Sequence, residues 1–247
     1  ALPISFGLDV EAVEEVWHGL VPPYAPLFAW ARGEGDRPAA ADMPVFRPFM
    51  LAHPLEDGRV DLGDYAAEWK WDGIRVQIVH MGGTTRLYSR AGDDITGSFP
   101  DVAAAFARTG VVDGELMVKG DAQGAALGEQ GGAASFNALQ QRLGRKQVSA
   151  RMMADYPAFV RLYDILFDGA EDLRELAWTG RRARLVAFAA TLDPGRFDVS
   201  PLIEATDFTE LEGLRAGARD AAIEGVMLKR RDSIYVPGRP KGPWFKW

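Results

Sequence analysis

The sequence predicts an α+β fold built from antiparallel strands and separate helices. Short stretches of alternating apolar and polar residues, joined by glycine turns, are interspersed with helical patterns from residue 44 onward. The strands do not alternate regularly with helices, as a doubly wound parallel sheet requires, and the sequence has no internal repeat. With 247 residues, 47% of them hydrophobic, the chain can bury a substantial core.

The N-terminal part of the chain differs from this region. The spacing of apolar residues predicts a helix over residues 10–20, with Asp9 as its N-cap, and a second short helix after Pro22-Pro23. Residues 33–43 are rich in glycine, alanine and charged residues, a composition typical of a linker. We therefore interpret this part as the end of a helical element followed by a linker.

A β-hairpin is predicted directly after Lys70. Residues 74–78 alternate between apolar and polar side chains, Gly82-Gly83 supplies a turn, and residues 85–90 provide the returning strand. Beyond the hairpin we expect helices over 99–108, 136–143 and 180–192, strands over 111–118, 159–167 and 223–229, and a loop over 120–134.

The composition excludes several classes of site. The absence of cysteine rules out disulfides, thiolate nucleophiles and cysteine-bound metals. His18, His53 and His80 are widely spaced, so we expect them on the surface or in packing rather than in a zinc site or a serine–histidine relay. No apolar run approaches the ~20 residues that span a bilayer, and the N-terminus has no export signal. We expect a soluble cytoplasmic protein.

The charge distribution leaves nucleic-acid binding possible only in patches. A net charge of −7 argues against a surface that is basic throughout, because duplex affinity depends on lysine and arginine neutralising phosphates. Two basic clusters stand out, and each is either a contact for nucleic acid or a solvated face. The clusters are Arg142, Arg145 and Lys146, and the C-terminal group Lys229, Arg230, Arg231, Arg239, Lys241 and Lys246.

The octapeptide EWKWDGIR, residues 68–75, is the most informative segment of the chain. It places the amine of Lys70 near a strand end, an Asp-Gly turn behind it, and Arg75 at the start of the next strand. A lysine amine attacks only when neutral, and at an ordinary pKa of about 10.4 roughly one in a thousand is neutral near pH 7.4. Burial and nearby cations, here Arg75, Arg90, Lys229 and Lys246, would lower that pKa. The alternative is an ordinary exposed lysine.

Other candidate residues lie in strands beside glycine or aromatic residues. Glu115 and Glu224 each neighbour a glycine, which permits close approach of a ligand, so their carboxylates suit a ribose hydroxyl or a divalent cation. The Tyr163 ring suits stacking on a nucleobase, and Trp69 and Trp71 suit an apolar wall around Lys70. The alternative for the two carboxylates is an ordinary solvent-facing strand position, and the alternative for the aromatic residues is packing. No P-loop or Gly-x-Gly-x-x-Gly pattern is present, so side chains would have to hold any nucleotide phosphates.

Taken together, these segments resemble a known set of motifs in the known order. They are Lys70-x-Asp72-Gly73-x-Arg75, Ser89-Arg90, Asp113-Gly114-Glu115, Tyr163-Asp164, Glu224-Gly225-Val226-Met227-x-Lys229 and Trp244-Phe245-Lys246, similar to nucleotidyltransferase motifs I, Ia, III, IIIa, IV and V. From residue 44 to 247 the chain resembles the adenylation domain of a bacterial-type ATP-dependent DNA ligase. The resemblance implies a nucleotidyltransferase, ATP-grasp-like fold of antiparallel sheets flanked by helices.

The resemblance also implies a role for each residue. Lys70 would attack the α-phosphate of ATP and form a covalent lysine-AMP, with Mg²⁺ assisting and Glu224 helping to position the metal. Glu68 would recognise adenine and Tyr163 would stack on it. The remaining expected contacts are those of Glu115 with the ribose, of Arg75 and Arg90 with the nucleotide or the 5′-phosphate of a nick, and of Lys229 and Lys246 with phosphate charge.

For the whole protein the resemblance implies nick sealing in DNA replication, repair and recombination. Residues 1–43 would be the tail of a helical DNA-binding domain plus a linker, and residues 44–247 the adenylation domain. An OB-fold domain, absent from this chain, would follow. The expected partner is nicked double-stranded DNA, for a monomer in the bacterial cytoplasm associated with the nucleoid. An RNA ligase or capping-type nucleotidyltransferase, or a non-catalytic nucleic-acid-binding module, remains as an alternative.

Overall fold

The structure is a computed structural model that describes residues 13, 16, 20, 22–38, 43–56, 59–119, 139–145, 147–218 and 223–247. The loop predicted over 120–134 lies outside these residues, as do Lys146, Asp9 and most of the helix predicted over 10–20. The helix predicted over 136–143 lies partly outside them, and its described part is helical only at residues 139–140.

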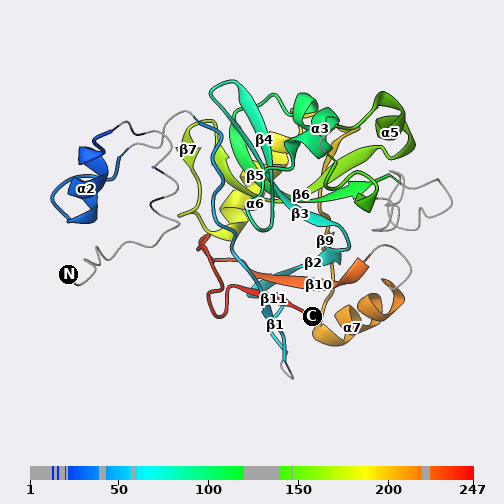
Figure 1. Cartoon of the computed structure of the whole chain (residues 1–247). Coiled ribbons are helices and arrows are strands. Elements are labelled where there is room, and N and C mark those ends of the chain that lie inside the picture. The colour runs from blue at the N-terminus through cyan, green and yellow to red at the C-terminus, as the bar shows by residue number, and fades with distance from the viewer. Residues whose placement is uncertain are drawn as a thin grey trace.

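Strands of the described region form two sheets (Figure 1). The six-stranded sheet has the order β4-β3-β5-β6-β7, with β8 paired to β6 beside this path. Its strands are β3 (Ile74–Met81), β4 (Thr84–Ser89), β5 (Gly110–Val118), β6 (Ala158–Asp168), β7 (Glu171–Asp172) and β8 (Phe197–Val199). All pairings except β6 with β8 are antiparallel. The α+β prediction is confirmed.

The second sheet contains strands from both ends of the described region. Its order is β1-β11-β10-β2-β9, and all pairings except β1 with β11 are antiparallel. The strands are β1 (His53–Pro54), β2 (Tyr65–Trp71), β9 (Leu202–Ile203), β10 (Ile223–Arg230) and β11 (Trp244–Lys246). Because β2 belongs to this sheet and β3 to the other, the chain crosses between the sheets immediately after Lys70.

The described helices flank the two sheets, except the most N-terminal one, which lies apart from them (Figure 1). They are α2 (Ala25–Ala31), α3 (Pro100–Ala105), α5 (Ala150–Asp155), α6 (Trp178–Ala189) and α7 (Phe208–Gly217), with a 3-10 turn at Thr96–Ser98. Helix α6 buries Trp178, Arg181, Leu185 and Phe188, a spacing of three and four residues that keeps one face against the six-stranded sheet. Helix α7 packs Phe208 and Leu211 against the other sheet.

The predicted elements form with small changes in their ends. The hairpin of β3 and β4 turns at Gly82 and Gly83, which both have positive φ and thereby match the twist of the strands. The helix predicted over 99–108 is shorter, since α3 stops at Ala105 and Phe106 turns into the core with no exposed surface. The helix predicted over 180–192 begins and ends earlier, at 178 and 189.

The inner faces of the sheets are also apolar. Val79 and Met81 of β3 pack with Met50, Tyr235 and Trp244, which belong to the segments around the other sheet. The neighbouring positions of β3 point to the opposite face and join the core beneath α3 and α6. Both faces of β3 are therefore covered by apolar side chains.

Two residues of the basic clusters do not lie on the surface. Arg142 has no exposed surface and forms an ion pair with Asp101. Lys229 is 2% exposed and pairs with Glu68. The prediction of solvated or nucleic-acid-binding faces is therefore wrong for these two residues, because each is held inside by a carboxylate distant in sequence. No helix among the described residues is long and apolar enough to cross a membrane.

Candidate functional site

A cavity of about 420 Å³ lies between the two sheets. Its walls come from β2, β3, β5, β6, β10 and β11, together with residues of the connecting segments. All nine site residues expected from the sequence line it: Glu68, Lys70, Arg75, Arg90, Glu115, Tyr163, Glu224, Lys229 and Lys246. The structure therefore brings the expected residues to one place, although they are up to 178 positions apart between Glu68 and Lys246.

The crossover between the sheets positions Lys70 and Arg75. Lys70 is the last but one residue of β2, and Arg75 is the second residue of β3. Gly73 between them lies so close to β5 that an added Cβ would lie 2.6 Å from the carbonyl oxygen of Leu116. Only glycine lets the turn approach β5 this closely, which explains why the Asp-Gly pair follows the lysine.

Lys70 forms an ion pair with Glu224 across the pairing of β2 with β10. Lys70 lies opposite Gly225, and the register shifts between Ile223 and Gly225, so Glu224 stands on a β-bulge. Gly225 has a positive φ, and an added Cβ there would collide with the backbone oxygen of Trp247. The bulge thus directs the Glu224 side chain, which is 46% exposed, toward the amine of Lys70.

The surroundings of Lys70 lower the pKa of its amine. Burial is the largest cause, and the positive charges of Lys246 and Arg90 lower the pKa further, while Glu115 and Asp72 oppose the shift. Arg90 and Lys246 are thus two of the four cations expected to act on Lys70. The Lys70 side chain keeps 31% of its surface exposed, so it faces the cavity and remains reachable.

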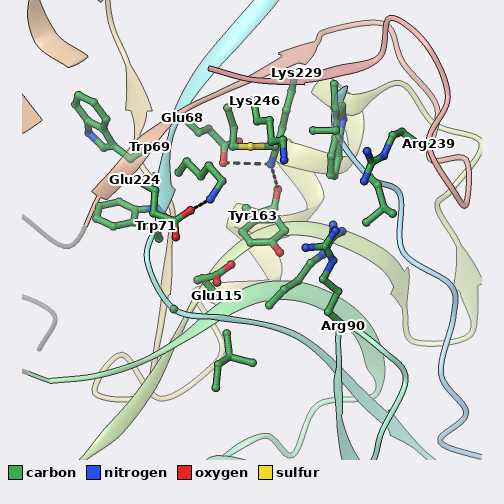
Figure 2. A pocket seen from close by; sticks show the side chains of 18 residues that line it. Glu68, Trp69, Trp71, Arg90, Glu115, Tyr163, Glu224, Lys229, Arg239 and Lys246 are labelled. Atoms are coloured by element: carbon green, nitrogen blue, oxygen red, sulfur yellow. Dashed lines mark hydrogen bonds and ion pairs between the residues drawn. The ribbon is translucent and has the colours of Figure 1, made fainter. Parts of the chain in front are cut away.

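A buried ion pair closes the inner end of the cavity. Lys229 Nζ donates hydrogen bonds of 3.2 Å to Glu68 Oε2 and to the backbone oxygen of Tyr163. The amine also lies 4.6 Å from the centre of the Tyr163 ring and 4.8 Å from that of Trp244 (Figure 2). Burial lowers the pKa of Lys229, and Glu68 opposes this shift. The pair therefore places a fixed positive charge beside an aromatic face.

Arg75 is held largely by the protein itself. Its Nη1 donates to the backbone oxygen of Met50 at 2.8 Å, and its Nη2 donates to Asp113 at 3.1 Å. The guanidinium stacks 4.1 Å from the centre of the Phe49 ring. Arg75 thus lines the cavity with a charge whose direction is fixed by three contacts, and its motif partner Asp113 serves as an anchor rather than a ligand-facing group.

The Glu115 carboxylate has an unusual protonation state. Burial raises its pKa to about 8, even though Arg75 and Lys70 both favour the ionised form. Burial also raises the pKa of the Tyr163 hydroxyl well above its ordinary value, so the phenol stays neutral. A carboxyl group that is protonated near neutral pH can donate as well as accept a hydrogen bond, as a sugar hydroxyl requires.

The site contains residues that the sequence reasoning did not select. Arg239 lines the cavity near Arg90, with its side chain directed inward (Figure 2). Met227 of β10 and Trp244 of β11 also line it. Arg239 follows Gly238, which bridges to Met50 on a distant segment. The basic C-terminal cluster was the available signal for Arg239, but local sequence does not specify which of its cations reaches the cavity.

The carboxylates fit a magnesium ion only together with a ligand. Among the described residues, no group of three or more His, Cys, Asp or Glu side chains could hold a metal ion. Glu224 and Glu115 nevertheless both point into the space beside Tyr163 (Figure 2). Mg²⁺ commonly takes one or two protein carboxylates and completes its octahedron with phosphate oxygens and water. The donor set therefore fits a metal that arrives with a polyphosphate.

Chemically, this cavity combines a partly desolvated amine, several cations, an aromatic face and two carboxylates. The cations Arg90, Lys246 and Arg239 line the cavity without a described ion-pair partner, and they are suited to bind phosphate groups. The aromatic inner end suits a nucleobase, and the amine lies between these two regions. The arrangement suits transfer of a phosphoryl-containing group to Lys70.

Comparisons with known proteins agree with this geometry. The family model described as "ATP dependent DNA ligase domain" matches residues 49–247. A DNA ligase of Methanothrix thermoacetophila is 32% identical over 260 residues, which cover 100% of this chain and 43% of the relative. A DNA ligase of Methanococcoides burtonii is 30% identical over 215 residues, or 87% of this chain and 36% of the relative. The chain therefore spans less than half the length of these relatives.

Solved structures show the same fold. A mycobacterial DNA ligase D complexed with ATP and MES superposes with a TM-score of 0.61 and 28% sequence identity. The match covers 81% of this chain and 59% of the mycobacterial chain. It is thus a likeness in fold and in sequence over most of the described region.

Proposed function

The chain belongs to the ATP-dependent DNA ligase family, and on that premise we propose that it is the adenylation core of such a ligase. The observation that carries this proposal is the ion-paired, partly buried Lys70 at the centre of a cavity lined by all the expected nucleotide-binding residues. The curated relatives extend beyond the chain, so nick sealing is proposed for the whole protein.

In the proposed reaction Lys70 Nζ, in its neutral form, attacks the α-phosphorus of ATP. A nitrogen–phosphorus bond forms, the bond from the α-phosphorus to the bridging oxygen of the β-phosphate breaks, and pyrophosphate leaves. One of the two protons of the neutral amine passes to solvent, and the other stays on the nitrogen. The product is a lysine-AMP phosphoramidate. Burial and the charges of Lys246 and Arg90 supply the neutral amine, because they lower its pKa.

The rest of the cavity orients the nucleotide. Adenine would lie between the Tyr163 ring and the Met227 side chain, with Glu68 at its polar edge. Glu115 would bind the ribose. Lys246 would bind phosphate charge, whereas Lys229, for which the same role was expected, is held at the nucleobase end by Glu68 and Tyr163. This placement holds the α-phosphate within reach of Lys70, and such positioning accounts for much of the rate enhancement in phosphoryl-type transfers.

Two arginines and a metal complete the proposed site. Arg90 and Arg75 would contact the nucleotide in this step or the 5′-phosphate of a nick in the next. Mg²⁺, when bound with ATP, supplies neutralisation of phosphate charge, and Glu224 is the carboxylate best placed to position it. Glu224 also holds Lys70 by their ion pair, so the same carboxylate orients the nucleophile before ATP enters.

For the whole protein we propose transfer of AMP from Lys70 to the 5′-phosphate of a nick in double-stranded DNA. Residues 1–43 would then be the tail of a helical DNA-binding domain and a linker, and residues 44–247 the adenylation domain. An OB-fold domain in the full-length enzyme would complete the clamp on DNA. A monomer in the cytoplasm, associated with the nucleoid, is the form and location that this substrate favours, with roles in replication, repair and recombination.

Covalent labelling tests the proposal. Incubation of the full-length enzyme with α-labelled ATP and Mg²⁺ should add one AMP, detectable by intact mass, and Lys70→Ala should abolish it. Labelling with γ-labelled ATP should not occur, since pyrophosphate leaves. Equal labelling of the wild type and Lys70→Ala would show that another group is the nucleophile. Stronger labelling by GTP than by ATP would instead favour a capping-type activity.

A further inference from the structure

Glu68 has two carboxylate oxygens in different situations. Oε2 accepts the hydrogen bond from Lys229, whereas Oε1 is buried and has no hydrogen-bond partner among the described residues. A buried carboxylate oxygen without a hydrogen-bond donor costs folding free energy, so a nearby positive charge or a ligand that donates a hydrogen bond must offset this cost. The residue as a whole is 1% exposed. Oε1 is therefore an acceptor without a protein donor in a nearly closed space.

The compensating charge is Arg182. Its Nη1 lies 3.8 Å from Glu68 Oε1, which is close enough for strong attraction but too long for a hydrogen bond. Nη1 is itself buried without a hydrogen-bond partner in the described region. The Arg182 side chain is 13% exposed and does not line the cavity, so it stands behind Glu68 rather than beside a ligand.

A hydrogen bond to another residue keeps Arg182 at 3.8 Å from Glu68. Its Nη2 donates to the backbone oxygen of Ser200, a residue with no exposed surface. The Ser200 hydroxyl in turn accepts a hydrogen bond of 3.0 Å from Trp71 Nε1, in the wall beside Lys70. The neighbouring Arg181 ties α6 to β6 through Asp164. Arg182 therefore cannot approach Glu68 without breaking the bond to Ser200 or moving α6.

We infer that Arg182 is a positioning residue for nucleobase selection: its charge holds the Glu68 carboxylate in place, with Oε1 left to accept a hydrogen bond from the exocyclic amine of a purine. This inference rests on the proposed function of the cavity as a nucleotide site. A purine with an amine at position 6 donates to Oε1. A purine with a carbonyl at that position places an acceptor against the carboxylate and is repelled.

The functional consequence concerns selectivity and binding, and it does not extend to the chemical step. Without the Arg182 charge, the Glu68 carboxylate can rotate further toward Lys229, so Oε1 no longer meets the 6-amine and the preference for that amine weakens. Because Lys70 and its ion pair with Glu224 are untouched, the rate at saturating ATP stays near that of the wild type. The KM for ATP should rise about tenfold, the effect of losing a hydrogen bond to a charged group.

The test compares ATP with purine riboside triphosphate, which lacks only the 6-amine, in full-length enzyme. Arg182→Met should raise the KM for ATP labelling about tenfold and leave that for the analogue nearly unchanged, so that the ratio between the two nucleotides falls. Arg182→Gln, which keeps a donor for Ser200 but no charge, should behave in the same way, and Arg182→Lys should restore part of the ratio. Arg184→Met, on the same helix but paired with Asp168 and Glu171 at the surface, is the matched control.

Two results would overturn the inference. An equal rise in KM for both nucleotides in Arg182→Met and Arg182→Gln would assign Arg182 a general structural role, and unchanged KM values for both nucleotides would remove it from nucleobase selection. Calorimetric binding of the two nucleotides provides a readout independent of labelling. If the wild type binds ATP with a 6-amine preference that Arg182→Gln loses, but no label forms, the proposed adenylylation fails while the inference stands.

Discussion

Lys70 and Glu224 form an ion pair because the pairing of β2 with β10 contains a bulge at the glutamate. The bulge allows a carboxylate that belongs to a different strand to reach the Lys70 amine. The same carboxylate is the proposed position for a metal ion. These two functions can be separated experimentally, since one concerns the amine and the other depends on metal concentration.

Glu224→Gln should raise the Mg²⁺ concentration needed for half-maximal labelling of Lys70. The amide keeps the size of the side chain but loses the charge that attracts the metal, and such changes around a metal cost roughly tenfold or more in metal affinity. A magnesium titration of the labelling rate provides the measurement. Glu212→Gln, an exposed carboxylate on α7 outside the cavity lining, should leave the titration unchanged. Identical magnesium curves for Glu224→Gln and wild type would remove Glu224 from the metal site.

The labelling rate should depend on pH through Lys70. Because burial and the nearby cations lower the pKa of its amine, the rate should increase with pH and level off below the ordinary lysine value of 10.5. Lys246→Gln removes one of those cations, so the levelling should move to higher pH and the rate near neutral pH should fall. Lys241→Gln, an exposed lysine outside the cavity lining, should leave the profile in place. If Lys241→Gln moved the pH profile of the labelling rate as far as Lys246→Gln does, the net charge of the protein would be the cause instead of the local charge of Lys246.

Lys229→Met should destabilise the fold strongly. It leaves the carboxylate of Glu68 buried without its ion-pair partner, and removal of one member of a buried pair costs roughly 3–5 kcal/mol. Urea unfolding measures the loss. The double variant Glu68→Leu with Lys229→Met should recover most of it. Arg230→Gln, which breaks an exposed pair with Asp232 two residues further on, should have little effect. A loss in the double variant as large as in Lys229→Met would show that the cost lies in packing.

Gly73→Ala should reduce both stability and labelling. The new Cβ would lie 2.6 Å from the Leu116 carbonyl oxygen, which forces the crossover away from β5 at a cost of about 1–3 kcal/mol. The displacement would also move Lys70, so the labelling rate should fall even where the protein is fully folded. Gly180→Ala in α6 is the control, because its Cβ meets Leu176 only at 3.7 Å and alanine favours a helix. Full labelling by Gly73→Ala would show that β5 yields locally.

Glu115→Gln should be more stable than the wild type at alkaline pH. Between pH 4.5 and about 8 the unfolded chain has lost the Glu115 proton while the folded protein retains it, so unfolding releases a proton and stability falls as pH rises. Glutamine stays neutral, and its advantage should grow across this window to roughly 1–2 kcal/mol, discounted for partial solvent contact. Thermal unfolding at several pH values measures it. A constant difference between pH 5 and 9 would contradict the raised pKa.

The sequence predicted the contents of the cavity better than its surroundings. Residues such as Lys70, Glu115 and Glu224 belong to short motifs whose spacing is dictated by chemistry, so their assembly was foreseeable from order alone. The long strands β3, β5, β6 and β10 were also foreseeable, since each carries its own apolar pattern. The strands β1, β9 and β11 were not, because two or three residues have no pattern and form only by pairing with partners distant in the chain.

The burial of charged residues also could not be predicted from the sequence. The partner of Arg142 is Asp101, and that of Lys229 is Glu68, 161 positions away. A local charge count cannot foresee either pair, so it assigned both cations to the surface. Helix α7 has a capping sequence from which its start could be predicted. Asp207 is the N-cap and accepts a hydrogen bond from the Glu210 backbone N–H, and the Glu210 carboxylate accepts one from the Thr206 backbone N–H.

The crossover of residues 70–75 couples the separation of the two sheets to the position of the Lys70 amine, the proposed nucleophile. Lys70 is fixed to one sheet and Arg75 to the other, with Gly73 seated against β5 between them. A small molecule that separates the sheets at this crossover would therefore displace the amine without touching it. Inhibitor design can aim at the crossover as well as at the proposed nucleotide position.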